Sequence, residues 1–160
     1  MSERGQITMN SISLDKTASD TQQIVDRSPF LNWLGIKVLS LESKTISARA
    51  SFRPEWVANS NTGQTQGGIL SALIDFAACF ALMNSIGRPA PTIDLRTDYH
   101  RPAKGCDLIA NGRVIKFGKQ ISTCEAELHD PDGRLIASGR GTFFTAHLKD
   151  GMAQRLETRG

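Results

Sequence analysis

Residues 67–85, GGILSALIDFAACFALMNS, decide the fold of this chain of 160 residues. The segment is apolar on nearly every face and rich in Ala and Leu, which predicts a helix of about five turns. A helix that is apolar all round is normally buried on all sides. Because it contains two glycines, an aspartate and an asparagine, it is too polar and too short for a membrane span. We therefore expect a sheet of the same chain to wrap around it.

Strand-like segments flank this helix, two before it and four after it. Apolar and polar residues alternate in these segments, and short turns rich in Gly, Pro and Asp separate them. The strand candidates are residues 35–41, 44–52, 92–100, 107–117, 120–129 and 135–144. Strands joined by short turns pair antiparallel. The sequence therefore predicts an α+β fold, a long central helix wrapped by an antiparallel sheet of about six strands, and argues against a parallel doubly wound sheet.

The remaining segments frame a single domain. The expected boundaries are residues 1–20 for a flexible N-terminal arm, 21–148 for the domain and 149–160 for a C-terminal tail. Apolar spacing over residues 24–34 predicts a short helix that Pro29 interrupts. Residues 53–66 are rich in turn-forming residues and predict a long loop, and long loops inside compact domains are usually functional or disordered.

Composition and charge exclude several classes of function. The chain has 19 Lys and Arg against 16 Asp and Glu, without a dense basic run, so neither a nucleic-acid partner nor a membrane anchor is indicated. The N-terminus lacks the apolar core of a secretory signal, and we expect a cytoplasmic protein. Cys79, Cys106 and Cys124 form no C-x-x-C pair, so we expect reduced thiols and no metal site.

Asp75 is the first candidate for catalysis, because it stands in the middle of the apolar helix. A buried, unpaired carboxylate is very costly, so Asp75 is either a structural residue, bonded for example to Ser71 one turn earlier, or a catalytic acid. Gly67 and Gly68 begin the same helix. They either permit a tight turn or let a carbonyl oxygen approach the helix N-terminus, where N–H groups favour negative charge.

The spacing of these residues bears on where a site can form. Gly68 and Asp75 are seven residues apart, about 10 Å along one helix. A nucleophile and an oxyanion donor must both lie about 3 Å from the reacting carbonyl, so one helix cannot supply both. Two antiparallel copies of the helix can, and an acyl-transfer site in this chain is therefore expected across a dimer.

Several segments resemble the hotdog-fold acyl-CoA thioesterases of the 4-hydroxybenzoyl-CoA thioesterase superfamily, and most closely the phenylacetate-degradation (PaaI-like) branch. The similarity extends from about Leu34 to Phe144. The segments that carry it are GGILSALID at 67–75, TIDL at 92–95, YHRPA at 99–103, GRLIA at 133–137 and GRGTFF at 139–144. The resemblance implies dimers, often paired into a dimer of dimers, with active sites at the dimer interface.

The resemblance also implies roles for single residues. The acid at the position of Asp75 acts as nucleophile or general base, the backbone N–H of Gly67 polarises the thioester carbonyl, and Thr92 orients the acid or the attacking water. The family often has His before the glycine pair, where this chain has Gln66, which donates a hydrogen bond but does not titrate. The family's upstream Asn falls on Ser60, between Asn59 and Asn61, and which of the three reaches the site stays open.

The sequence as a whole predicts an acyl-CoA thioesterase that needs no cofactor beyond the coenzyme A of its substrate. Besides the catalytic candidates, we expect contacts to the substrate from Gly68, Ser71, Arg101, Lys104 and Lys119, with the three basic residues near the CoA phosphates. The acyl group is expected along Leu70, Leu73, Phe76 and Phe80, which are equally good core residues. The alternative is a hotdog protein that binds acyl-CoA without turnover, because Gln66 departs from the family pattern.

Overall fold

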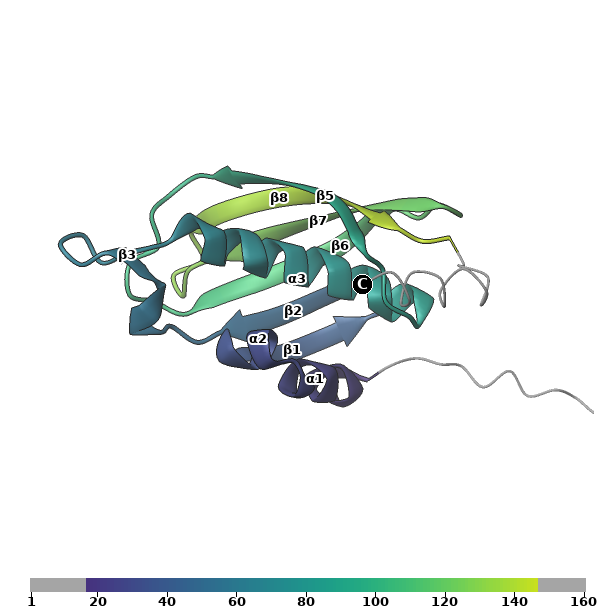
Figure 1. The fold of residues 1–160 in the computed structure, drawn as a ribbon, viewed down its shortest axis with the longest axis horizontal. Coiled ribbons are helices and arrows are strands. Elements are labelled where there is room, and N and C mark those ends of the chain that lie inside the picture. Colours follow the sequence, from purple (N-terminus) through teal and green to yellow (C-terminus); the bar gives the residue numbers. More distant parts are fainter. Residues whose placement is uncertain (1–16, 147–160) are drawn as a thin grey trace, which may run out of the picture.

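The computed structural model describes residues 17–146; the first sixteen residues of the expected arm, the last two of the expected domain and the whole expected tail lie outside the described residues. One curved sheet holds a long helix against one of its faces, and two short helices cover one edge of the sheet (Figure 1). The predicted α+β fold is confirmed, with six antiparallel strands around one central helix.

The elements follow the predicted order with few additions. The helices are α1 (Ala18–Arg27), α2 (Pro29–Trp33), the 3₁₀ helix η1 (Pro54–Trp56) and α3 (Gly67–Ile86). The strands are β1 (Ile36–Glu42), β2 (Thr45–Ala50), β3 (Val57–Asn59), β4 (Gln64–Thr65), β5 (Thr92–Tyr99), β6 (Leu108–Lys116), β7 (Ile121–His129) and β8 (Leu135–Phe144). The large sheet has the order β1-β2-β6-β7-β8-β5, so β1 and β5 are its edges.

The chain becomes helical earlier than the sequence suggested. The expected arm of residues 1–20 is wrong at its end, because α1 already begins at Ala18. Thr17 and Asp20 form a capping box, in which each side chain accepts a hydrogen bond from the other residue's backbone N–H. The helix expected over residues 24–34 is two helices, since Ser28 ends α1 and caps α2 in front of Pro29.

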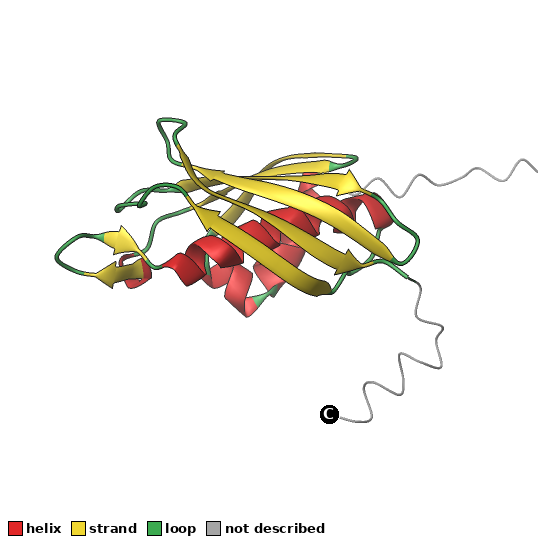
Figure 2. Cartoon of the chain, turned by 90° about the horizontal axis from the view of Figure 1, so that it is seen from above, coloured by secondary structure: helices red, strands yellow, loops and turns green. Residues whose placement is uncertain are grey.

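The expected loop at residues 53–66 contains short regular structure. It forms η1 and the hairpin β3–β4, which extends beyond the large sheet at the end where α3 begins (Figures 1 and 2). Its return strand is tied down by two backbone bonds, from Thr65 N–H to the Ala103 carbonyl at 2.8 Å and from Gln66 N–H to the Trp56 carbonyl at 2.7 Å. The start of α3 is therefore held in a fixed place.

Helix α3 lies directly against the inner face of the sheet. A Cβ on Gly112 of β6 would come within 2.0 Å of the Ala77 carbonyl oxygen, so only glycine permits this approach. By length and mean hydropathy, 20 residues and 1.9, α3 could also cross a membrane, contrary to our expectation, but the sheet packs against it as on a core helix.

The expectation that α3 is buried on all sides is wrong. A sheet one layer thick covers one side of the helix, and a stripe on the other side stays partly exposed. The stripe consists of Ala72, Asp75, Cys79, Met83 and Ile86. Its spacing of three and four residues places these side chains on one face.

Candidate active site

Asp75 is held by the first residue of the edge strand. The Thr92 hydroxyl donates a hydrogen bond of 2.9 Å to Asp75 Oδ1. Within residues 17–146 no other group bonds to this carboxylate, so Oδ2 is free to act on a ligand. The structure brings together the predicted pair Asp75 and Thr92, and the alternative bond from Asp75 to Ser71 is not formed.

The side chain of Gln66 folds back over the start of α3. Its Oε1 accepts hydrogen bonds from the N–H groups of Gly68 and Ile69. Because a backbone N–H can only donate, the oxygen must face the helix, and Nε2 of Gln66 remains available as a donor. The Gly67 N–H has no acceptor among the described residues. The helix tip thus offers two donors to a ligand, Gly67 N–H and Gln66 Nε2.

Gly68 leaves room for the Gln66 side chain, a role that was not predicted from the sequence. A Cβ at this position would lie 2.6 Å from Gln66 Oε1, so a larger residue would displace the capping side chain. Its N–H, which we expected to contact substrate, is occupied by Gln66. The glycine therefore makes room for the cap, and Gly67 is left as the backbone donor.

Ser71 belongs to a group of hydroxyls between α3 and β5. Its Oγ lies 2.7 Å from the Tyr99 hydroxyl and 3.2 Å from Thr97 Oγ1, and the Tyr99 hydroxyl donates to the Gly67 carbonyl at 3.2 Å. Neither Tyr99 nor Thr97 is predicted from the sequence as a site residue. The period-2 pattern of residues 92–100 could have placed both on the inner face of the strand.

The three candidate residues of the β3–β4 hairpin, Asn59, Ser60 and Asn61, differ in what their side chains contact. Asn59 is a turn residue, because its Oδ1 accepts from Asn61 N–H at 2.9 Å and its carbonyl accepts from Thr62 and Gly63. Ser60 and Asn61 are exposed. The hairpin therefore presents Ser60 and Asn61 to solvent and uses the Asn59 side chain within its own turn.

Two of the three predicted phosphate contacts lie close to the helix tip. Arg101 and Lys104 line a surface hollow of about 490 Å³. Lys104 bridges to Gln64, two residues before Gln66. Lys119 is not part of this group, because it follows the far end of β6 whereas Lys104 precedes its beginning.

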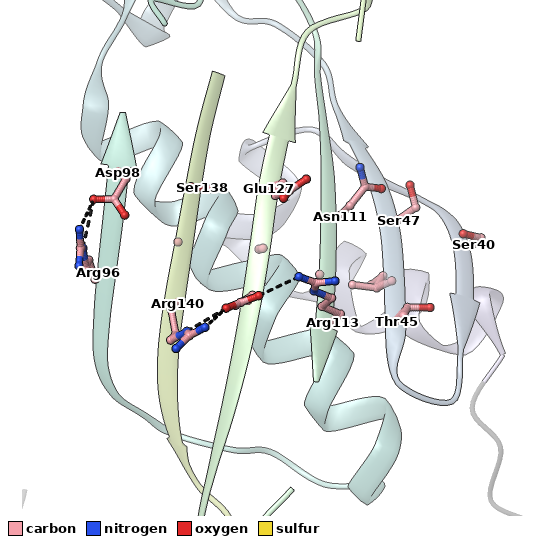
Figure 3. Close-up of a pocket in the computed structure, with 15 residues that line it drawn as sticks. Ser40, Thr45, Ser47, Arg96, Asp98, Asn111, Arg113, Glu127, Ser138 and Arg140 are labelled. Atoms are coloured by element: carbon pink, nitrogen blue, oxygen red, sulfur yellow. Dashed lines mark hydrogen bonds and ion pairs between the residues drawn. The ribbon is translucent and has the colours of Figure 1, made fainter. Parts of the chain in front are cut away.

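A larger hollow, of about 600 Å³, lies on the outer face of the sheet, with α3 behind it (Figure 3). Glu125, one of its lining residues, accepts hydrogen bonds from Arg113 at 3.0 Å and from Arg140 at 2.9 Å. These hydrogen bonds, first from Arg140 and then from Arg113, lower the pKa of the Glu125 carboxyl. The hollow contains none of the predicted site residues, and its three arginines are paired with Asp98 and Glu125, so we do not place the active site there.

The cysteines are not candidates for the nucleophile. All three thiols are free, and Cys79 donates to the Ala90 carbonyl at 3.4 Å. Burial, and next the charge of Asp75, raise the pKa of Cys79 to about 12, and burial raises that of Cys124 to about 12. No group of three His, Cys, Asp or Glu within residues 17–146 is arranged to hold a metal ion.

The predicted acyl-lining residues are core residues in the single chain. Each residue is at most 8% exposed, and the four are Leu70, Leu73, Phe76 and Phe80.

The acid and the backbone donor lie on the same helix but are not adjacent. Asp75 and Gly67 are eight residues apart, which is about 12 Å along α3. One chain therefore holds an acid beside Thr92 and a donor tip beside Tyr99, and the two are separated along the helix.

Comparison with known proteins adds to this geometry. A profile of the thioesterase superfamily matches residues 63–137, a segment that includes the donor tip, Asp75 and Thr92. A putative esterase of Halobacterium salinarum is 31% identical over 147 residues, covering 84% of this chain and 96% of that protein. The medium/long-chain acyl-CoA thioesterase YigI of Salmonella typhimurium is 26% identical over 139 residues, covering 77% of this chain and 89% of that protein.

Solved structures give the same result. A protein of the thioesterase superfamily, determined by X-ray crystallography, is 40% identical, with a TM-score of 0.77 over 79% of this chain and 96% of its own. A mutant form of the phenylacetic acid degradation protein PaaI of Thermus thermophilus is 30% identical, with a TM-score of 0.66 over 73% of this chain and 98% of its own.

Proposed function

The chain belongs to the thioesterase superfamily, whose chemistry is the hydrolysis of thioesters, and on that premise we propose that its substrate is an acyl-CoA and that its active site is shared by two chains. The likeness to YigI supports a CoA thioester as the substrate. The likeness to PaaI of Thermus thermophilus supports a place in the PaaI-like branch. One observation carries the proposal: the Asp75 carboxylate held by Thr92 and the Gly67 N–H without an acceptor lie on one helix, too far apart for one chain to bring both to the same carbonyl.

In the proposed reaction the thioester carbonyl oxygen accepts hydrogen bonds from Gly67 N–H and Gln66 Nε2 of one chain. Asp75 of the second chain attacks the carbonyl carbon or takes a proton from a water that attacks it. Negative charge develops on the carbonyl oxygen, where the two donors and the positive end of α3 stabilise it. The tetrahedral intermediate collapses, the C–S bond breaks, and CoA leaves as a thiolate. If a water has attacked, the free acid is formed at once and the proton on Asp75 passes to the thiolate or to solvent. If Asp75 has attacked, a second water hydrolyses the anhydride between the acyl group and Asp75, which releases the acid and restores the carboxylate. Thr92 keeps the carboxylate turned toward the substrate.

The second chain is proposed to add to β5. No residue of this edge strand is fully buried, and the partly exposed stripe of α3 lies beside it. A two-fold axis between two β5 strands would run the α3 helices antiparallel and bring the Asp75 of each chain toward the Gly67 of the other. This arrangement completes two sites, each with the acid of one chain and the donor tip of the other.

The CoA moiety is proposed to extend from the helix tip into the hollow beside Arg101 and Lys104. Arg101 donates to the Leu135 carbonyl at 3.0 Å, and neither its charge nor that of Lys104 has an acidic partner among the described residues. A third basic residue of the hollow, Arg134, is already paired with Asp130 and Asp132. Arg101 and Lys104 are therefore the two positive charges that phosphate groups would meet.

A second candidate function is the binding of acyl-CoA without turnover. It is favoured by Gln66, which replaces a residue that titrates in many relatives of the family. Gln66 can nevertheless take part in catalysis, because its Nε2 is free to donate a hydrogen bond to the thioester carbonyl.

Release of free thiol from acyl-CoA esters separates the two functions. We expect turnover with at least one member of a panel of short-chain, long-chain and aryl CoA esters, followed with a thiol reagent. Tight binding of an ester, measured by calorimetry, without any thiol release across the panel would overturn the enzyme and leave the binding protein.

A further inference from the structure

Tyr99 combines an exposed ring with an engaged hydroxyl. It is the only tyrosine of the chain and stands at the end of β5, with 55% of its surface exposed. Its hydroxyl donates to the Gly67 carbonyl at 3.2 Å and lies 2.7 Å from Ser71 Oγ. Ser71 Oγ in turn donates to Thr97 Oγ1 at 3.2 Å, so the Gly67 carbonyl and the Ser71 hydroxyl are both within reach of the phenol proton.

The ring itself lies beside the helix tip. A Cβ placed on Gly67 would be 3.4 Å from three atoms of Tyr99, so the ring touches this glycine along its side. The bond from the Tyr99 hydroxyl to the Gly67 carbonyl connects the first turn of α3 to β5, the strand on which we place the second chain.

A matching tie exists at the acid. Thr92, at the opposite end of β5, bonds to Asp75. Both functional parts of α3 are therefore attached to one strand, the acid through Thr92 and the donor tip through Tyr99. If two β5 strands pair, the hydrogen bonds from Thr92 to Asp75 and from Tyr99 to Gly67 fix the distance between the Gly67 of one chain and the Asp75 of the other.

We propose that Tyr99 is a positioning residue, whose hydroxyl holds the Gly67 donor in register with the acid of the partner chain. This inference rests on the proposed function. Tyr99 does not itself touch the reacting carbonyl; it acts through the helix tip. A small displacement of a hydrogen-bond donor is costly in catalysis, because its stabilising effect is realised only when the donor meets the charge of the transition state.

The substitution Tyr99→Phe tests the proposal, since it removes one oxygen and keeps the ring. We expect kcat for the best acyl-CoA to fall about tenfold while KM changes less than about twofold, because the lost interaction stabilises only the transition state. The control is Ser138→Ala, which removes a hydroxyl bonded to His100 at 2.8 Å on the other face of the sheet. We expect this control to keep the kcat of the unmodified protein.

A readout independent of turnover accompanies the kinetics. Hydrogen exchange of the Gly68 and Ile69 amides, which the Gln66 cap protects, should accelerate in Tyr99→Phe and stay unchanged in Ser138→Ala. Unchanged kcat together with unchanged exchange would overturn the role of Tyr99, as would a loss confined to KM. Absence of thiol release from the unmodified protein would instead overturn the proposed function, whatever the variant does.

Discussion

The two edge strands of the six-stranded sheet differ in how they are covered: β1 is covered by a helix and a side chain, and within residues 17–146 β5 is not. At β1, helix α1 covers the edge, and the Gln22 side chain accepts from Val38 N–H at 2.8 Å and donates to the Ile36 carbonyl at 3.1 Å, as a neighbouring strand would. At β5 the described chain supplies no such cover, and every residue is at least partly exposed. The difference separates an edge protected against pairing from an edge left free for it.

The chemistry-bearing residues follow the same division. Asp75 and the Gly67 tip are both attached to β5, through Thr92 and Tyr99. The β1 edge carries no candidate for catalysis. An uncovered strand is a liability unless something pairs with it, and we propose that a second copy of the chain pairs with β5 and completes the site.

The largest effect is expected on the open side, at the acid. Asp75→Asn keeps the size of the side chain and can still accept the Thr92 bond, but it is neither a good nucleophile nor a base. We expect kcat to fall at least about a thousandfold, with a melting temperature close to that of the unmodified protein. Thiol release and a thermal melt check this. Turnover close to normal would remove Asp75 from the mechanism.

A matched pair of substitutions compares the two edges directly. Ile93 on β5 is 53% exposed and Leu39 on β1 is 52% exposed, and each stands at an irregularity of its edge strand. A carboxylate in place of the Ile93 side chain would put a charge in the proposed interface, which costs binding free energy. We expect Ile93→Glu to dissociate the dimer and lower activity about tenfold at micromolar protein, and Leu39→Glu to do neither.

Sedimentation and thiol release at several protein concentrations measure this comparison. Restoration of Ile93→Glu activity at high concentration would support an interface by mass action. Equal behaviour of the two variants would mean that the open edge is not where chains meet.

Substitution of Gln22 removes side-chain hydrogen bonds that cover the β1 edge. Gln22→Ala removes the partners of Val38 N–H and the Ile36 carbonyl, and we expect a loss of about 1–2 kcal/mol in the free energy of unfolding. Gln22→Glu keeps an acceptor for Val38, but it sets a second oxygen of a carboxylate against the Ile36 carbonyl and against Asp26, to which Gln22 Nε2 donates at 2.7 Å, so its loss should be at least as large. Urea unfolding gives the values. Activity should persist in both variants, and a large loss of activity would contradict the division of roles between the edges.

The smallest effect concerns Cys79, on the partly exposed stripe of α3. With a pKa of about 12, its thiol is protonated at pH 8 to all but about one part in ten thousand. Iodoacetamide should therefore modify Cys106 before Cys79 at pH 8, and the rate at Cys79 should rise about tenfold for each unit of pH, because the thiolate reacts. Mass spectrometry over time follows both. Rapid labelling of Cys79 at pH 8 would show that burial does not protect it.

Long periodic segments made most of the fold predictable from the sequence. The six strands alternate and α3 is continuously apolar, so their type and order follow from pattern alone. The strands of the β3–β4 hairpin have three and two residues, too few for any period. The early start of α1 did have a signal, a Thr and an Asp three residues apart at Thr17 and Asp20, which is close to a capping box.

The site was predictable to the extent that its residues share one segment. Asp75 and Gly67 could be named as candidates from the sequence because both lie on the central helix. The orientation of Gln66 and the contact of Tyr99 with Gly67 depend on tertiary packing, which a single sequence does not display. Lys119 was grouped with Arg101 and Lys104 by charge alone, and the length of β6 keeps it apart from them.

Complementation between two inactive variants tests the shared site most directly. Asp75→Asn lacks the acid, and Gly67→Pro lacks the donor N–H. Proline is common at the first position of a helix, so it is compatible with position 67. The residue before a proline prefers an extended backbone, and Gln66 already has one, with φ −64° and ψ 134°. The two variants are unfolded together and refolded at equal concentration. In a mixed dimer one site then combines the intact Gly67 of one chain with the intact Asp75 of the other.

Half of the dimers are mixed and each has one intact site, so the account predicts thiol release at about a quarter of the level of the unmodified protein. A mixture that stays as inactive as its two parents, while sedimentation shows mixed dimers, would contradict it.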